Sequence, residues 1–251
     1  MEIIKTEGIV VSETNYSESS KIIQIFTRDY GLISVMSKGS RNIKSKLRGI
    51  SNRFSYCEYN ISYKEDGIST LIDGSTISTL RNIITDINKI TYLSYMLDLV
   101  IQVYKHSNSN EIYEILISII KKLDTGLDPE VLTYILELKL LKYLGIEPNV
   151  DECAICGNQK NILTISIDNG GYVCSNCYKT GKIYSSSIIK LIRMLIYVDI
   201  DSIDKINIKD ENKKELDAFI MEYYDSLSGI YLKSKNFLKG LKKLDEKKGS
   251  N

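Results

Sequence analysis

The spacing of hydrophobic positions along the chain changes near Thr79. From Gly8 to about Ser78, apolar and polar residues alternate in runs rich in β-branched and aromatic residues, separated by the turn signals DYG, SKGSRN and KEDG. These runs predict five short strands: GIVVSE (8–13), SKIIQIFT (20–27), GLISVMS (31–37), FSYCEYNISY (54–63) and ISTLIDGSTIS (68–78). Five antiparallel strands with a long polar connection after the third favour a small closed barrel over an open sheet with exposed edges.

Beyond Thr79, apolar residues recur every three or four positions, which is typical of helices packed along one face. The pattern predicts helices over residues 80–106, 110–124, 128–145, 185–198 and 211–234. The third has the clearest limits, because Asp128 is a suitable N-cap, Pro129 suits the first helical position and Gly145 follows the end.

These patterns predict an α+β multidomain protein. Residues 1–79 are expected to form an OB-like five-stranded β-barrel, and residues 80–149 and 183–245 the two parts of a mainly α-helical domain. A cysteine-rich insert spans residues 150–182, and the lysine-rich residues 246–251 are expected to be a disordered tail.

Composition adds an expectation about location. The chain has 251 residues, is 43% hydrophobic and carries a net charge of +1, so its overall charge makes no case for binding nucleic acid or membrane. The start, MEIIKTEG, lacks the features of a secretory signal, and no uncharged apolar stretch approaches the roughly 20 residues of a membrane span. We expect a soluble cytoplasmic protein, associated with the nucleoid if it binds DNA.

Four of the five cysteines form two C-x-x-C pairs, CAIC at 153–156 and CSNC at 174–177, separated by 17 residues. This spacing is typical of a four-cysteine zinc site, in which tight turns bring paired thiolates onto one tetrahedral ion. A thioredoxin-like redox pair needs only one such motif, and two disulfides conflict with a cytoplasmic location. Four thiolates close the coordination shell, so we predict a structural Zn²⁺ held by Cys153, Cys156, Cys174 and Cys177.

A basic segment follows the third predicted strand. Between Asp29 and Glu58 there is no acidic residue, yet residues 37–55 carry six cations, which are Lys38, Arg41, Lys44, Lys46, Arg48 and Arg53. Glycine and serine punctuate this stretch, which suggests a flexible connection that packs little and suits a phosphate backbone. The alternative is a solvated loop that keeps the barrel soluble.

Aromatic residues lie in or beside the adjoining strands, where an OB barrel presents stacking platforms for the bases of a single strand. The candidates are Tyr30, Phe54, Tyr56, Tyr59 and Tyr63. The alternative is that these residues alternate along strands simply because they pack well there.

Little in the sequence indicates catalysis. The phosphate-loop, dinucleotide-binding, H-E-x-x-H and G-x-S-x-G motifs do not occur, and the acidic residues form no evident pair. The single histidine, His106, falls at the end of a predicted helix, and Cys57 reads as a small buried hydrophobe in a strand. A binding protein is therefore favoured over an enzyme.

Two stretches together resemble one family. TEGIVVSETNYSESSKIIQIFTRDYGLISVMSKGSR (6–41) resembles the N-terminal barrel of bacterial RecO recombination-repair proteins, and LELKLLKYLGIEPNVDECAICG (136–157) followed by GGYVCSNC (170–177) resembles their helix-to-zinc-finger junction. The resemblance implies an OB domain, a helical domain and a zinc finger, although some family members lack the four cysteines.

The resemblance also implies an activity without turnover chemistry. Such a protein binds single-stranded and double-stranded DNA, anneals complementary strands and, with RecR, helps RecA replace the single-strand-binding protein SSB during DNA repair and homologous recombination. The positions that would contact DNA in this chain are the six cations from Lys38 to Arg53.

Two other functions are alternatives. A zinc-ribbon transcription or translation accessory protein that binds duplex DNA or RNA would carry cations on the finger itself, yet residues 153–177 contain Lys160 alone, against Asp168. A nuclease would require a carboxylate cluster for metal ions, and none is evident.

The resemblance suggests one further partner, the acidic and apolar C-terminal tail of SSB. Such a tail requires an apolar pocket rimmed by cations. The candidates are Lys233, Lys235, Phe237, Leu238, Lys239, Leu241 and Lys242. The alternative is that these leucines close the helical core and the lysines face water.

Overall fold

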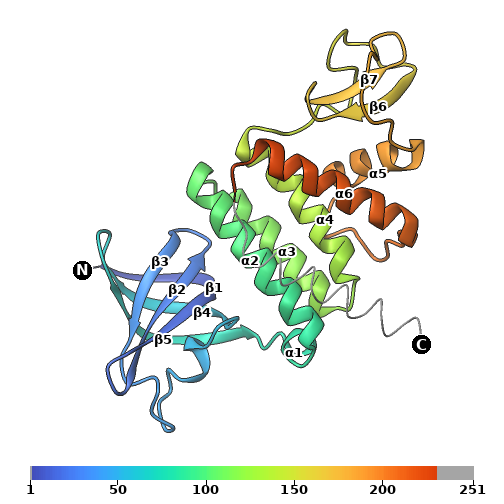
Figure 1. Cartoon of the computed structure of the whole chain (residues 1–251). Helices are drawn as coiled ribbons and strands as arrows, with labels where there is room; N and C mark the ends of the chain where they lie inside the picture. The colour runs from blue at the N-terminus through green and yellow to red at the C-terminus, as the bar shows by residue number, and fades with distance from the viewer. Residues whose placement is uncertain (1, 231–251) are drawn as a thin grey trace. The chain divides into compact units, whose positions relative to one another are not determined.

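The computed structural model describes residues 2–230, which form two compact units (Figure 1). One unit comprises residues 2–90 and 108–117, and the other comprises residues 91–107 and 118–230. The first contains the strand-rich N-terminal region, and the second contains most of the helices together with the cysteine-rich insert. The predicted order of a β-barrel followed by a helical region is confirmed.

Five strands form the OB-like barrel: β1 Glu2–Tyr16, β2 Ser20–Thr27, β3 Gly31–Ser37, β4 Tyr56–Tyr63 and β5 Ser69–Ser78. They pair in the order β1-β2-β3-β5-β4, and β4 pairs back with β1. All neighbours are antiparallel except β3 and β5, which are parallel over Val35–Ser69 and Met36–Thr70. The first strand begins at Glu2 rather than at Gly8, because residues 2–7 also pair with β4.

One long strand, β1, closes the barrel because it pairs with two different strands. Its first half pairs with β4 from Glu2 to Ile9, and its second half pairs with β2 from Gly8 to Tyr16. A bulge between Val10 and Ser12 bends the strand at this change of partner. Gly8 pairs on both sides, and a Cβ there would lie 2.7 Å from Ile25 Cγ2 and 3.0 Å from Phe26 O. Only glycine fits this closely packed bend.

The barrel interior is filled by β-branched and aromatic side chains. Its buried members are Ile4, Val10, Ile23, Ile25, Ile33, Val35, Ile50, Cys57, Tyr59, Ile61 and Leu71. Cys57 is buried as predicted. Ile50 comes from a 3₁₀ turn, Gly49–Ser51, inside the basic segment, and Leu47 also packs against this core. The expectation that the segment packs little is therefore wrong at these two positions, because their side chains close one side of the barrel core.

The helical region consists of α1 Arg81–Ile84, α2 Ile87–Ser107, α3 Glu111–Asp124, α4 Pro129–Leu140, α5 Ser186–Tyr197 and α6 Asp210–Leu227. The predicted helix over 80–106 is divided in two. The Asp86 carboxylate accepts hydrogen bonds from the backbone N–H groups of Asn88 and Lys89, so it starts a new helix after α1 has ended at Thr85.

Helix α4 begins as predicted. The Asp128 carboxylate accepts from the backbone N–H of Glu130 at 2.8 Å, Pro129 follows it, and Lys213 Nζ lies 2.6 Å from Asp128 Oδ2. A 3₁₀ turn, Leu141–Leu144, continues the helix to Gly145, which is left-handed at φ 70°. Most of α4 is buried, and it packs against α5 and α6.

Helix α6 ends at Leu227, seven residues before the predicted end, because Gly229 adopts a left-handed φ of 64° that stops the helix. The last predicted helical residues, 231–234, lie outside the described region. None of the helices within residues 2–230 has the length and hydropathy of a membrane-spanning segment.

Gly8→Ala tests the role of the bend in β1. The added methyl group would have to displace Ile25 or the Phe26 carbonyl, so we expect the barrel to lose about 1–3 kcal/mol of stability. Urea unfolding followed by near-ultraviolet circular dichroism of the tyrosines measures this. Gly49→Ala is the matched control, because no atom lies within 4 Å of its added Cβ. Equal stability of the two variants would contradict the assigned role.

Candidate metal centre and nucleic-acid surface

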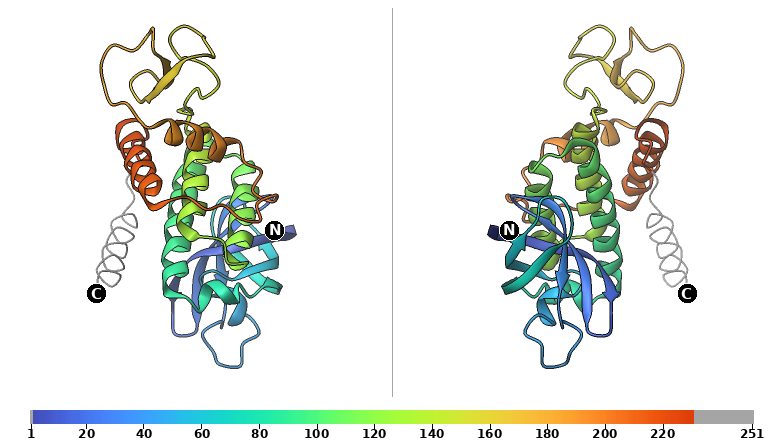
Figure 2. Two further views of the ribbon diagram at one scale, coloured as in Figure 1. Left: turned by 90° about the vertical axis from the view of Figure 1, so that its right-hand side faces the viewer. Right: turned by 90° about the vertical axis from the view of Figure 1, so that its left-hand side faces the viewer.

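The cysteine-rich insert is built on a short hairpin of β6 Ile162–Ser166 and β7 Gly171–Cys174 (Figure 2). A parallel bridge joins Asn149 to Gly171 and brings the chain entering the insert beside β7. Gly171 has φ 155°, and a Cβ there would lie 2.3 Å from Asn149 O. Glycine is thus required where the first cysteine pair is brought against the second.

Each C-x-x-C pair lies in a tight turn. Gly157 N–H donates to Cys153 O at 2.9 Å, and Cys177 N–H donates to Cys174 O at 3.1 Å. The strand end at Cys174 also donates its N–H to the Cys153 sulfur at 3.4 Å. The two pairs, far apart in sequence, therefore face one another through their sulfur atoms.

The four sulfurs fit a tetrahedral ion. The Sγ atoms of Cys153, Cys156, Cys174 and Cys177 all lie within 4.8 Å of one another. Cys156 Sγ and Cys174 Sγ are 3.8 Å apart. A tetrahedron with zinc–sulfur bonds of about 2.3 Å has edges of about 3.8 Å, so Cys156 and Cys174 have the spacing that such an ion requires, and no two of the four sulfurs are farther apart than 4.8 Å. This is a site that can hold a metal ion.

The cysteine thiols of the cluster differ in pKa. Burial raises the pKa of Cys153, but hydrogen bonds from backbone N–H groups, that of Cys174 foremost, outweigh it and bring the pKa down to about 6. Contacts with the sulfurs of Cys156 and Cys174 raise the pKa of Cys177 to about 12. Without a cation, one thiolate is therefore favoured at the expense of its neighbours, and binding a cation to all four releases protons.

The insert is attached to α5 by polar contacts. The Tyr172 hydroxyl donates to Ile189 O at 2.7 Å, and the Arg193 guanidinium donates to Val150 O at 3.1 Å and to Asp151 Oδ1 at 2.9 Å. Tyr197 also donates to the Asp151 carboxylate, and together Tyr197 and Arg193 lower the pKa of Asp151. The metal centre and α5 are thus parts of one hydrogen-bonded assembly.

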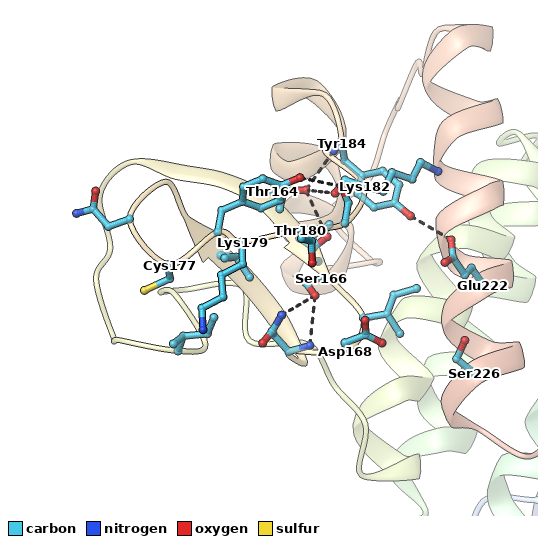
Figure 3. A pocket seen from close by; sticks show the side chains of 18 residues that line it. Thr164, Ser166, Asp168, Cys177, Lys179, Thr180, Lys182, Tyr184, Glu222 and Ser226 are labelled. Atoms are coloured by element: carbon cyan, nitrogen blue, oxygen red, sulfur yellow. Dashed lines mark hydrogen bonds between the residues drawn. The ribbon is translucent and has the colours of Figure 1, made fainter.

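A hollow of about 640 Å³ lies between the insert and α6 (Figure 3). Lys182 Nζ lies 4.3 Å from the centroid of the Tyr184 ring, and the Tyr184 hydroxyl points to Glu222 at 3.4 Å. Lys179 and Lys182 line this hollow together with Asp168 and Glu222. Charges of both signs are present, so the hollow offers no preference for a polyanion.

The basic segment, by contrast, has one sign of charge. We call residues 38–48 the basic loop; it extends from the barrel after β3 (Figures 1 and 2). All six predicted cations are exposed. Within residues 2–230, five of them form no ion pair with any acidic group: Lys38, Arg41, Lys44, Lys46 and Arg48. Arg53 lies beside the loop, where its guanidinium donates to Val11 O at 3.2 Å and covers the Phe54 ring at 4.7 Å.

The loop is ordered rather than freely flexible. Arg41 N–H donates to Ser19 O at 2.9 Å, and the Arg41 guanidinium donates to Ser17 O at 2.9 Å. Successive turns follow, with Ser45 N–H donating to Asn42 O at 3.0 Å and Arg48 N–H to Ser45 O at 3.2 Å. The cations are therefore held out by hydrogen-bonded turns.

The aromatic residues predicted to stack on bases are buried or covered by other side chains. Tyr56 and Tyr59 are buried, with the Tyr59 hydroxyl donating to Ile50 O at 3.0 Å, so neither can stack on a base. Tyr30 packs against Tyr63 with ring centroids 5.1 Å apart, and Phe54 lies under Arg53. Alternation along a strand could not tell which tyrosines face the interior, because β4 packs against the loop residue Ile50 as well as against the other strands.

Sequence reasoning also missed Tyr16. It ends β1 beside the turn that receives Arg41, and it is more exposed than Tyr30. The available signal was an aromatic residue among the polar residues Ser12–Ser19, where burial is not expected. The proposed SSB-tail residues, Lys233 to Lys242, lie outside the described region, so that interaction stays a prediction.

Comparison with known proteins agrees with this architecture. The family model "Recombination protein O N terminal" matches residues 1–80, and "Recombination protein O C terminal" matches residues 84–236. A protein named DNA repair protein RecO from Listeria monocytogenes serotype 4a is 34% identical over 243 residues, covering 95% of each chain. Proteins of the same name from Bacillus pumilus, 32% identical over 98% of each chain, and Halalkalibacterium halodurans, 34% identical over 96% of each, are similarly related. The chain belongs to the recombination protein O (RecO) family.

Proposed function

We propose that this protein acts in DNA repair and homologous recombination as a mediator that binds DNA, anneals complementary single strands and, with RecR, promotes loading of RecA onto SSB-coated DNA. The repair role follows from membership of the RecO family. The observation that carries DNA binding is the basic loop, whose five exposed cations have no acidic partner within the described residues.

Charge and shape support this assignment of the DNA surface. A phosphate backbone presents closely spaced negative charges, and lysine and arginine side chains that neutralise them release bound counterions. The loop offers Lys38, Arg41, Lys44 and Lys46 within nine residues, on turns held by Ser17 and Ser19. No acidic side chain competes within the loop itself.

The activity is proposed to be non-enzymatic. Annealing requires two polyanions to be brought together, and a cationic surface lowers their mutual repulsion without bond chemistry. The sequence contains no phosphate-loop motif for nucleotide hydrolysis. A zinc-ribbon accessory protein is the alternative, and the mixed charges of Lys179, Lys182, Asp168 and Glu222 around the insert do not favour it.

The metal is proposed to be a structural Zn²⁺. Four cysteine sulfurs leave no open coordination position for a substrate or water, whereas catalytic zinc normally retains one. When bound, the ion would supply folding free energy to an insert whose two-stranded sheet is too small for its own core.

Cys174→Ser tests the metal centre. We expect purified protein to hold one zinc per chain and the variant to lose it, with lower thermal stability of the insert and α5, because Cys174 ends β7 and the insert bonds to Ile189 and Arg193. Elemental analysis and the spectrum of the cobalt-substituted protein measure this. Cys57→Ala is the control, since Cys57 lies in the barrel core and should not affect zinc. Zinc-free protein purified without chelator would refute the assignment.

Charge reversal in the basic loop tests the DNA surface. If about four cations contact phosphates, the logarithm of single-strand affinity should fall with the logarithm of salt concentration at a slope near −3, from about −0.7 per contact. Arg41→Glu, Lys44→Glu and Lys46→Glu together should nearly abolish binding, whatever the DNA sequence, because phosphate contacts carry no base information. Fluorescence anisotropy at several salt concentrations measures both quantities.

The matched control reverses three exposed lysines elsewhere, Lys205, Lys209 and Lys214. It should leave affinity and slope nearly unchanged. Wild-type affinity and slope in the loop variant would mean that the loop is only a solvated connection and that DNA binds elsewhere. Circular dichroism should show both variants folded.

Annealing of labelled complementary oligonucleotides tests the mediator role. We expect annealing without any nucleotide, loss of it in the triple loop variant, and annealing of SSB-coated strands only when SSB retains its acidic tail. Fluorescence transfer between the labelled strands follows the reaction, with RecR added in a parallel series for RecA loading. A requirement for ATP would contradict a non-enzymatic role, and equal annealing with tail-less SSB would contradict the tail contact.

A further inference from the structure

The turn between β1 and β2 forms one surface with the basic loop. Strand β3 ends at Ser37, which pairs with Lys21 near the start of β2. The basic loop therefore leaves the barrel beside the turn that joins β1 to β2. Arg41 joins the two through its N–H to Ser19 O and its guanidinium to Ser17 O, both at 2.9 Å. These bonds therefore hold the first part of the basic loop against the β1–β2 turn.

Tyr16 precedes this turn, and its aromatic ring is not covered by another side chain. It is 52% exposed and immediately precedes Ser17, the carbonyl of which receives the Arg41 guanidinium. Within the described residues Tyr16 has no ring contact, cation–π contact or side-chain hydrogen bond. Of the aromatic residues that the barrel strands and turns offer, Tyr16 thus presents a free face, whereas Tyr30 and Phe54 are already covered.

Ile43 lies two residues beyond Arg41, in the basic loop. It is 84% exposed, and turns at Asn42 and Ser45 hold its backbone, with Asn42 N–H donating to Gly39 O at 3.1 Å. A single exposed isoleucine is ordinary by itself. Here, however, the exposed apolar side chain comes between Arg41 and Lys44 in the sequence, and Arg41 is bonded to Ser17, the residue after Tyr16.

We propose that Tyr16 and Ile43 contact unpaired bases, so that the basic loop holds single-stranded DNA in preference to duplex. This inference rests on the proposed function, because it requires the loop cations to bind phosphates. Phosphates are present in both forms of DNA, but the faces of bases are open to a side chain only where the bases are not paired and stacked. Tyr16 supplies a flat ring for stacking, and Ile43 supplies an apolar contact for a neighbouring base.

The extent of apolar surface distinguishes nucleic acid from the other polyanionic partner, an anionic membrane. Both attract Arg41, Lys44 and Lys46, but a membrane contact gains its strength from a broad apolar face. Here two apolar side chains stand among several cations, which matches alternating bases and phosphates better than a lipid interior. The occupant is therefore a single strand of DNA.

Tyr16→Ala and Ile43→Ala, compared in the full-length protein, test the inference. Tyr16→Ala should weaken binding to an unstructured oligonucleotide about tenfold, within the range given by about 1–3 kcal/mol per stacked base, while duplex affinity and the salt slope stay unchanged. Ile43→Ala should act in the same direction and more weakly. A 2-aminopurine base in the single strand should lose part of its fluorescence change in both variants.

Two variants separate base contact from general effects. Tyr16→Phe retains the ring and should restore the selectivity lost in Tyr16→Ala. Ile3→Ala is the matched control, because Ile3 is 71% exposed on β1 opposite Ser62, among other strand residues rather than beside Arg41. It should bind both forms of DNA like the unchanged protein.

The inference is overturned if Tyr16→Ala and Ile43→Ala keep the wild-type ratio of single-strand to duplex affinity, or if both affinities fall equally. It is also overturned if the variants lose binding to phosphatidylglycerol vesicles and retain single-strand affinity. If the triple loop reversal abolishes DNA binding while Tyr16→Ala changes nothing, only the base contact fails. If the triple reversal binds normally, the proposed DNA surface itself fails.

Discussion

The hydrogen bonding of β1 to two different strands is the constraint on which the N-terminal unit depends. One strand of 15 residues pairs with β4 at its start and β2 at its end, and it bends at Gly8 and the following bulge. The first half of β1 is hydrogen-bonded to β4 and the second half to β2, so this one strand links the two ends of the sheet and closes the barrel. The chain between β3 and β4 is therefore available for a purpose other than pairing.

The loop that results combines packing with exposure. Leu47 in the loop and Ile50 just after it pack in the barrel core, and Arg41 ties the first half of the loop to the β1–β2 turn. The cations between these two anchors are exposed to solvent. Because turns already fix much of the backbone, little further conformational entropy would be lost when a ligand binds. For the proposed DNA binding, a basic surface that is ordered in advance loses less conformational entropy than a flexible tail.

In the second unit, a small insert must be ordered without a core of its own. The β6–β7 hairpin has two strands, and a hairpin of that size is marginal in water. Four sulfurs within 4.8 Å and bonds from Tyr172 and Arg193 to the adjoining segments replace a core. The hydrogen bonds connect the insert to α5, and the proposed zinc would add to its order.

The sequence by itself determined the elements and the ligands. Alternation of apolar residues fixed the five strands, three- and four-residue spacing fixed most helices, Asp128 and Pro129 fixed the start of α4, and the C-x-x-C spacing brought four cysteines together. The strands, the helices and each C-x-x-C turn are local features, so neighbouring residues encode them, whereas the meeting of the two cysteine pairs also depends on the bridge from Asn149 to Gly171. Only the tertiary structure decided that Tyr56 and Tyr59 are buried, that Ile50 packs in the barrel core, and that Arg41 bonds to Ser17, the residue after Tyr16. Those outcomes depend on which segments distant in sequence meet when the barrel closes, and period-two alternation cannot specify that.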